Sequence, residues 1–140
     1  MKILVAVDGS PYTKRMVAYL AAHDEWLGAH HEYTVVHAVP PVPPSAVRVL
    51  AKATLKSYYD ESAEKVLKPI RSFFEKQGLN AQFLSKVGPA AETIADLANK
   101  GDYDLLMLGS HGHGTLGNLV MGSVATKVLA HCRTPVLLVR

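Results

Sequence analysis

Glycine and serine gather in one segment near the end of the chain. Five of the ten glycines lie within residues 109–122, and Ser123 follows them directly. Glycine lets backbone N–H groups approach a ligand closely, and several such groups pointing inward form a nest for an anion. A helix that begins there adds its own free N–H groups and the positive end of its dipole. The segment therefore predicts a phosphate site, and a plain surface loop explains the glycines poorly.

The distribution of charge favours an anionic ligand at the same end of the chain. The net charge is only +3, and residues 1–104 hold 12 basic and 12 acidic side chains. Residues 105–140 hold Lys127, Arg133 and Arg140 and no acidic residue. Because the excess is small and local, it suits a bound anion better than a nucleic-acid surface.

Two familiar nucleotide motifs fit this segment incompletely. Residues 112–117 match the dinucleotide fingerprint G-x-G-x-x-G, which belongs to the first strand-to-helix turn and needs an acid about 20 residues later. Here the match lies late in the chain, and no acidic residue follows Asp104. The spacing from Gly117 to Gly122 matches a Walker P-loop, but Ser123 stands where the lysine belongs. Neither NAD binding nor a P-loop is predicted.

Five short apolar runs must position these residues. Four are nearly continuous, as in strands buried on both faces, and the third alternates, as in an edge strand. The runs are Ile3–Val7, Tyr33–Val39, Ala81–Val87, Leu105–Leu108 and Val136–Val139. Strands that alternate with helices pair in parallel through right-handed crossovers. We predict one α/β domain over residues 1–140, a doubly wound, flavodoxin-like, five-stranded parallel sheet with helices on both faces, in the order β-α-β-α-β-α-β-α-β.

Four helices are expected between the runs. Ser10 can cap the first, with Pro11 in its first turn. The others are expected within residues 46–77, 90–99 and 123–132, and Pro69 should kink or restart the second. Pro40–Pro44 is expected to be a stiff extended loop. The apolar faces are expected to include Val47, Leu50, Leu55, Tyr58, Val66, Ile70 and Phe73 in the second helix and Val124, Val128 and Leu129 in the fourth.

The spacing of three glycines is similar to a known signature. Gly109, Gly112 and Gly122-Ser123 read G-x2-G-x9-G-S. Four sequence blocks accompany this spacing in order along the chain. They are residues 2–10 (KILVAVDGS), 36–39 (VHAV), 104–112 (DLLMLGSHG) and 134–139 (TPVLLV). Together they resemble the ATP-binding branch of the universal stress protein family over the whole chain. The resemblance implies an adenine nucleotide alpha hydrolase-like fold that binds ATP or a related adenine nucleotide.

The resemblance also implies roles for individual residues. Adenine would lie between Ala6 and Ala38–Val39, and Leu108 to Gly109 would approach the ribose or the base. Asp8 would approach the ribose or a Mg²⁺ ion that arrives with the nucleotide, and it also suits a cap on the first helix. The residues that would face phosphate are Gly112, His113, Gly122, Ser123 and Val124. Ser123 is in addition expected to be the N-cap of the last helix.

One position departs from the family pattern. Many relatives carry arginine after His111-Gly112, and this chain carries His113. Arginine is always charged and binds phosphate through two hydrogen bonds, whereas histidine is mostly neutral above pH ~6.5. Phosphate binding should then depend on backbone N–H groups, and it should tighten as the pH falls through the titration of His113.

The resulting prediction is a cytoplasmic, nucleotide-responsive stress regulator with no nucleic-acid or membrane partner and an unidentified client protein. A slow ATPase or phosphotransferase that uses His113 or Asp8, and a nucleotide-free interaction module, remain alternatives. No serine has a recognisable Asp–His relay, so no catalytic residue is assigned, and the histidines lack metal-ligand spacing. The single Cys132 excludes an internal disulfide and fits a reducing compartment. No apolar run approaches the ~18 residues of a membrane span.

The last apolar run predicts self-association. No helix is expected after Val136–Val139, so an edge position would leave backbone groups unpaired beside apolar side chains. Pairing with a second copy across a two-fold axis would satisfy both strands, and members of the family commonly dimerise through this strand. We predict a homodimer.

Overall fold

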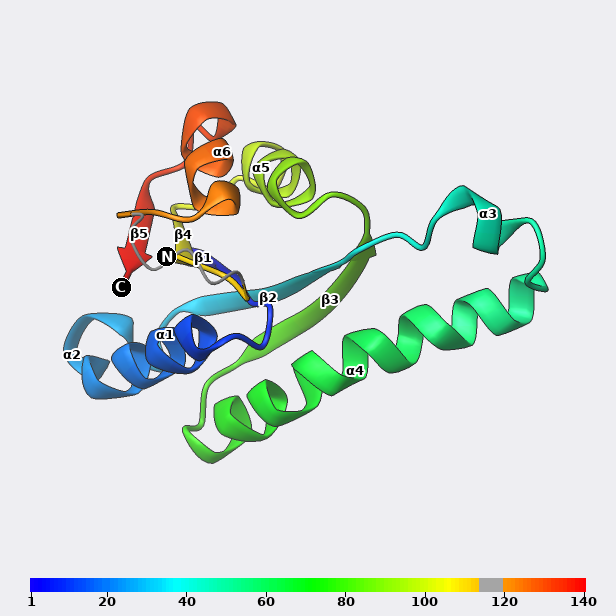
Figure 1. The fold of residues 1–140 in the computed structure, drawn as a ribbon. Coiled ribbons are helices and arrows are strands. Elements are labelled where there is room, and N and C mark those ends of the chain that lie inside the picture. Colours follow the sequence, from blue (N-terminus) through cyan, green and yellow to red (C-terminus); the bar gives the residue numbers. More distant parts are fainter. Residues whose placement is uncertain (114–119) are drawn as a thin grey trace.

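A five-stranded sheet lies between two layers of helices in the computed structural model, which describes residues 1–113 and 120–140 (Figure 1). The elements are β1 (Lys2–Ala6), α1 (Pro11–Ala22), α2 (Asp24–Leu27), β2 (Glu32–Val39), α3 (Pro44–Val47), α4 (Lys52–Lys76), β3 (Ala81–Val87), α5 (Ala90–Lys100), β4 (Leu105–Gly109), α6 (Ser123–His131) and β5 (Val136–Val139). The strands follow the order β3-β2-β1-β4-β5, and each neighbouring pair is parallel. The predicted doubly wound α/β fold is confirmed, as is the edge position of β3.

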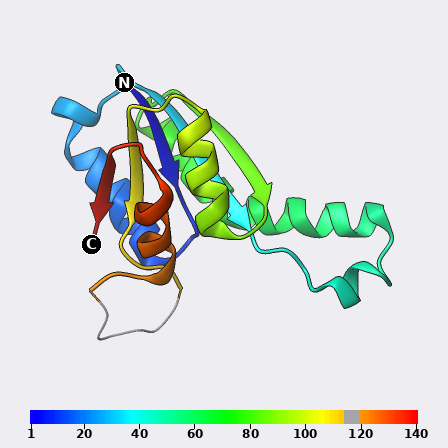
Figure 2. The ribbon, with the colours of Figure 1, turned by 90° about the horizontal axis from the view of Figure 1, so that it is seen from above.

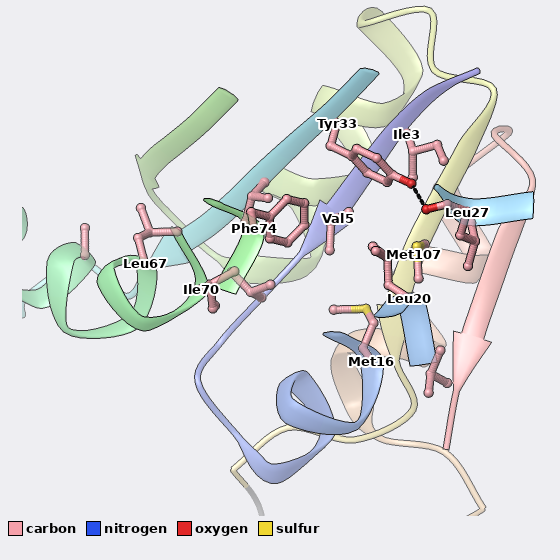
Figure 3. Close-up of a cluster of buried hydrophobic side chains, with 14 of the residues drawn as sticks. Ile3, Val5, Met16, Leu20, Leu27, Tyr33, Leu67, Ile70, Phe74 and Met107 are labelled. Atoms are coloured by element: carbon pink, nitrogen blue, oxygen red, sulfur yellow. Dashed lines mark hydrogen bonds between the residues drawn. The ribbon is translucent and has the colours of Figure 1, made fainter. Parts of the chain in front are cut away.

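The central strand β1 is covered on both faces. Its odd-numbered residues Ile3 and Val5 pack in a cluster with α1, α2 and α4 (Figure 3), and Leu4 and Ala6 pack with α5 and α6 on the other face. Figure 2 shows the same two layers on either side of the sheet. Burial on both faces explains why this strand is a continuous apolar run instead of an alternating one.

The segment after β2 differs in part from its prediction. The short helix α3 begins at Pro44, so the expectation that the whole of Pro40–Pro44 is extended was wrong at its last residue. Proline favours the first turn of a helix because its missing N–H would lack a partner there anyway. Helix α4 then runs without a restart through Pro69.

The buried face of α4 covers only its second half. Its buried residues are Ala63, Leu67, Ile70 and Phe74. Val47, Leu50 and Tyr58 are exposed, contrary to expectation, because α3 and the first turns of α4 project beyond the sheet (Figures 1 and 2).

The inward face of α6 also differs from its prediction at one position. Ala125 and Val128 are buried, whereas Leu129 is 40% exposed, so the expectation that Leu129 faces the core was wrong. Leu129 follows Val128 directly, and one residue turns an α-helix by about 100°. The side chain of Leu129 therefore lies outside the buried face of α6.

Tyr33 connects the start of β2 to the end of α2. Its ring is 2% exposed and packs edge-on against Phe74, with 5.6 Å between ring centroids (Figure 3). The hydroxyl donates to the carbonyl oxygens of Leu27 and Gly28. Burial raises the pKa of Tyr33 to about 12.

Replacing Tyr33 by phenylalanine should lower the free energy of unfolding by about 1–3 kcal/mol, because two buried carbonyl groups lose their donor. Since the folded pKa is raised above the ordinary value of about 10, the contribution of Tyr33 is complete below pH 10. It is lost as the pH rises towards 12. Urea unfolding of both proteins between pH 7 and pH 11 measures this, and a difference that grows with pH would contradict it.

Candidate functional site

The strand order creates a crevice at the centre of the sheet. The chain leaves β1 towards β2 on one side, and β4 lies on the other side of β1. Ligands of open parallel sheets bind outside the carboxyl ends of the strands, where the winding reverses. A cavity of about 220 Å³ lies there, between the ends of β1, β2 and β4 and the starts of α5 and α6. Its lining residues are Ala6, Val7, Asp8, Thr13, His37, Ala38, Ala90, Ile94, Leu108, Gly109, His111, Gly112, His113, Gly122, Ser123, Val124 and Ala125.

The structure brings together all but one of the residues that the sequence analysis singled out. Residues from β1, β2, β4 and the start of α6, far apart in the chain, share the wall of this cavity. Val39 does not line it. Its side chain is 2% exposed and packs in the core cluster with α4, on the opposite face of β2 from Ala38.

The turn after β1 holds Asp8 in place. Gly9 has a φ of +75°, a conformation that favours glycine. One carboxylate oxygen of Asp8, Oδ1, accepts hydrogen bonds from Ser10 N and from Thr13 Oγ1, each at 2.9 Å. Ser10 is the N-cap of α1 and accepts from Thr13 N, as predicted. Asp8 therefore supports the start of α1 and also lines the cavity.

Two glycines allow the loop after β4 to approach the rest of the site. A Cβ on Gly112 would lie 2.9 Å from Asp8 Oδ2. A Cβ on Gly122 would lie 3.0 Å from His111 Cα and 3.1 Å from Ser110 O, which are backbone atoms that cannot turn aside. A larger residue at Gly122 would force these backbone atoms to move by a few tenths of an ångström, and one at Gly112 would displace the carboxylate of Asp8.

The start of α6 opens onto the cavity. Gly122 is the N-cap and has no side-chain cap, so the expectation that Ser123 is the N-cap was wrong by one residue. Gly122 N donates a hydrogen bond to Ser110 O at 2.6 Å, and Ser110 N donates one to Val139 O at 2.8 Å. This pairing starts the helix at Ser123. The backbone N–H groups of Ser123, Val124 and Ala125 thus occupy the first turn, where a helix supplies no acceptor.

Two histidines flank this helix start. His113 Nε2 donates to the backbone oxygen of Asp8 at 2.6 Å, which joins the loop after β4 to the end of β1. His111 Nδ1 lies 2.9 Å from Ser110 Oγ, and its ring packs against Tyr12 with 4.9 Å between centroids. The wall of the cavity thus carries imidazole groups beside the N–H groups of α6.

Several lining residues were not singled out from the sequence. Thr13 lies three residues after the N-cap Ser10, at the usual capping position, so a capping analysis could have found it. His37 lies in a strand, and a polar residue within an apolar run was the signal that could have marked it. Ala90 and Ile94 of α5 reach the site only through the packing of α5 beside α6, which no local pattern reveals.

Part of the glycine segment lies outside the described residues. Gly114 and Gly117, and with them most of the match to the dinucleotide fingerprint, fall within 114–119. In the ranges that are described, no three His, Cys, Asp or Glu side chains come close enough together to hold a metal ion. None of the helices described there combines the length and apolar character needed to cross a membrane.

The parallel sheet and the cavity at its switch point define a small α/β protein with a cavity where a glycine-bounded helix begins. The model of the universal stress protein family matches residues 1–140. The chain belongs to the universal stress protein family.

Known proteins agree with this assignment. A universal stress protein of Thermus aquaticus is 37% identical over 138 residues, which cover 99% of this chain and 97% of the relative. The solved structure of MJ0577 from Methanocaldococcus jannaschii matches with a TM-score of 0.80 at 26% identity and covers 99% of this chain and 94% of that chain. A universal stress protein of Arabidopsis thaliana, solved with AMP bound, has a TM-score of 0.70 at 14% identity and covers 99% and 90%.

Proposed function

We propose that this protein is a cytoplasmic regulator that binds an adenine nucleotide, with ATP as its nucleotide, and that acts as a homodimer. The observation that carries the proposal is the start of α6. Its first-turn N–H groups open, between Gly112 and Gly122, onto a cavity at the switch point of the sheet.

The residues present fit the two chemical parts of a nucleotide. Free N–H groups and the positive end of the helix dipole suit phosphate oxygens at the start of α6. A Cβ at Gly112 or Gly122 would press on Asp8 or on the backbone of Ser110 and His111, and so would disturb the wall beside this helix start. Apolar side chains of Ala6, Leu108 and Ile94 form another part of the wall and suit the faces of a purine.

Asp8 is the residue that would hold a magnesium ion. Its Oδ1 is engaged by the turn into α1, while Oδ2 lies near Gly112 on the phosphate side. A carboxylate beside phosphate oxygens is repulsive unless a cation lies between them, and Mg²⁺ prefers carboxylate, phosphate and water oxygens. The ion would neutralise phosphate charge, and Asp8 would orient it through Oδ2.

Binding is proposed ahead of catalysis because of the charges around the cavity. Rapid phosphoryl transfer needs cationic groups on the transferred phosphate and an oriented nucleophile. Among the described lining residues there is no lysine or arginine. Any hydrolysis of ATP should therefore be slow.

The Arabidopsis protein was solved with AMP bound, which supports an adenine nucleotide as the ligand proposed here. The number of phosphates is tested by comparing ligands. Calorimetric titration with Mg-ATP, ATP without metal, AMP and cAMP tests the proposal, together with mass spectrometry of small molecules released from the purified protein. Saturable heat with ATP is expected. No heat with any of the four ligands would overturn the proposed function.

His113→Ala should weaken ATP binding, because the imidazole lies beside the proposed phosphate position and its Nε2 joins the loop after β4 to Asp8. Because this residue is exposed, the loss should be roughly two- to fivefold. Calorimetric titration of both proteins with Mg-ATP measures it, and equal affinities would contradict the prediction.

A further inference from the structure

His37 is a buried polar side chain at the cavity whose function the site description leaves open. The residue is 8% exposed and lines the cavity near the carboxyl end of β2. Its ring nitrogen Nδ1 lies 2.9 Å from the backbone oxygen of Val7, across from the end of β1. Histidines buried to this degree have both ring nitrogens satisfied in most folded proteins.

The contact with Val7 determines which ring nitrogen carries the proton. A carbonyl oxygen only accepts hydrogen bonds, so Nδ1 must be the protonated nitrogen. In the neutral ring, Nε2 then presents a lone pair and acts as an acceptor. Among the residues that the structure describes, Nε2 has no hydrogen-bond partner, while His37 forms part of the cavity wall.

We infer that His37 Nε2 accepts a hydrogen bond from the nucleoside part of the bound nucleotide and thereby sets which way round the ligand lies. This inference rests on the proposed function. The start of α6 offers only donors, which suit phosphate oxygens, and His37 offers an acceptor, which suits a ligand N–H or O–H group. Phosphate oxygens and Nε2 would repel each other, so the phosphates are directed to α6 and the nucleoside to β2.

Two donors of an adenine nucleoside have the required chemistry. One is a ribose hydroxyl and the other is the 6-amino group of the base. Asp8, the residue after Val7, carries a further acceptor at the same end of β1 and also lines the cavity. Ligand analogues that lack one donor at a time distinguish these two sources.

Two variants separate the two nitrogens of the ring. In His37→Asn, the amide nitrogen can take the place of Nδ1 and keep the bond to Val7, while nothing replaces Nε2. In His37→Gln, the amide oxygen can take the place of Nε2, while the donor to Val7 is lost. We expect the Asn variant to bind ATP roughly 2- to 10-fold more weakly with its melting temperature kept, and the Gln variant to bind ATP nearly as wild type with a lowered melting temperature.

The analogues are 2′-deoxyATP, 3′-deoxyATP and purine riboside triphosphate, which lacks the 6-amino group. In wild type, the analogue without the donor used by His37 should bind more weakly than ATP, and in the Asn variant this difference should disappear. Equal ATP affinity in wild type and the Asn variant would overturn the inference and leave the proposed function standing. Equal losses in the Asn and Gln variants, or analogue differences unchanged by His37→Asn, would overturn it too. No ATP binding by wild type would overturn both.

Discussion

Gly122→Val should weaken ATP binding by roughly 5- to 150-fold while leaving a folded protein. The new Cβ would meet His111 Cα and Ser110 O at 3.0 and 3.1 Å, so the backbone on either side of the helix start must separate. Strain of this kind costs about 1–3 kcal/mol. If the ATP-bound conformation carries this strain, the affinity for ATP drops by roughly 5- to 150-fold. The two branched methyl groups would in addition occupy space at the start of α6.

Calorimetric titration with Mg-ATP measures this loss, and circular dichroism reports whether the sheet and helices persist. Ala53→Val is a matched control, because it adds the same methyl groups at an exposed position of α4 far from the cavity. ATP turnover should fall with Gly122→Val if any turnover belongs to this site. Wild-type affinity in the Gly122→Val protein would refute the placement of phosphate at α6.

Leu138→Pro should shift the proposed homodimer towards monomers. Pro135 O and Val139 O accept hydrogen bonds from Leu106 N and Ser110 N, so the carbonyl groups of the odd-numbered residues face β4. Backbone groups alternate along a strand, and those of Leu138 therefore point away from the sheet. Proline removes its outward N–H group. Because a two-fold axis would repeat the loss, the dimer should weaken by roughly 5- to 150-fold.

Sedimentation velocity across a range of concentrations measures the change. Leu138→Ala removes the same side chain and keeps the N–H group, so it separates backbone pairing from side-chain packing. An unchanged dimer in Leu138→Pro would show that association uses another surface. A wild type that is monomeric at every concentration would refute the dimer itself.

The strands and their sheet could be predicted because they depend on local patterns. Residues 3–7 are apolar throughout, and both faces of β1 proved to be covered. The alternation in residues 81–87 correctly indicated an edge. Ser10 was recognised as a cap because the capping contact to Thr13 is only three residues long. Such features need no knowledge of the rest of the chain.

Long-range packing limited the rest of the fold prediction. The apolar residues Val47, Leu50 and Tyr58 follow a helical pattern, but α4 extends past the sheet that would have covered them. Ser123 has the side chain of a good N-cap, yet the bond between Gly122 N and Ser110 O places the cap one residue earlier. In both cases a distant element overrides the local preference.

The site residues that glycine spacing marks could be predicted from the sequence. Those that only the arrangement of the strands and helices brings to the cavity could not. Gly112 and Gly122 were found from their spacing, and the structure shows why a Cβ would not fit at either position. His37 and Ile94 come from other elements, and their sharing of one cavity with Asp8 follows from the strand order. Strand order depends on how the crossovers pack, which no single segment encodes.

Ser110 links two parts of the molecule that otherwise have separate roles. Its N–H group bonds to Val139 O on the side of β5 that faces β4, and its carbonyl oxygen accepts a hydrogen bond from the N–H group of Gly122 at the start of α6. If ligand binding shifts the start of α6, these two hydrogen bonds are the path by which the shift would reach the strand proposed to join two copies. Nucleotide binding and dimerisation would then be thermodynamically coupled, so that each changes the equilibrium constant of the other by the same factor.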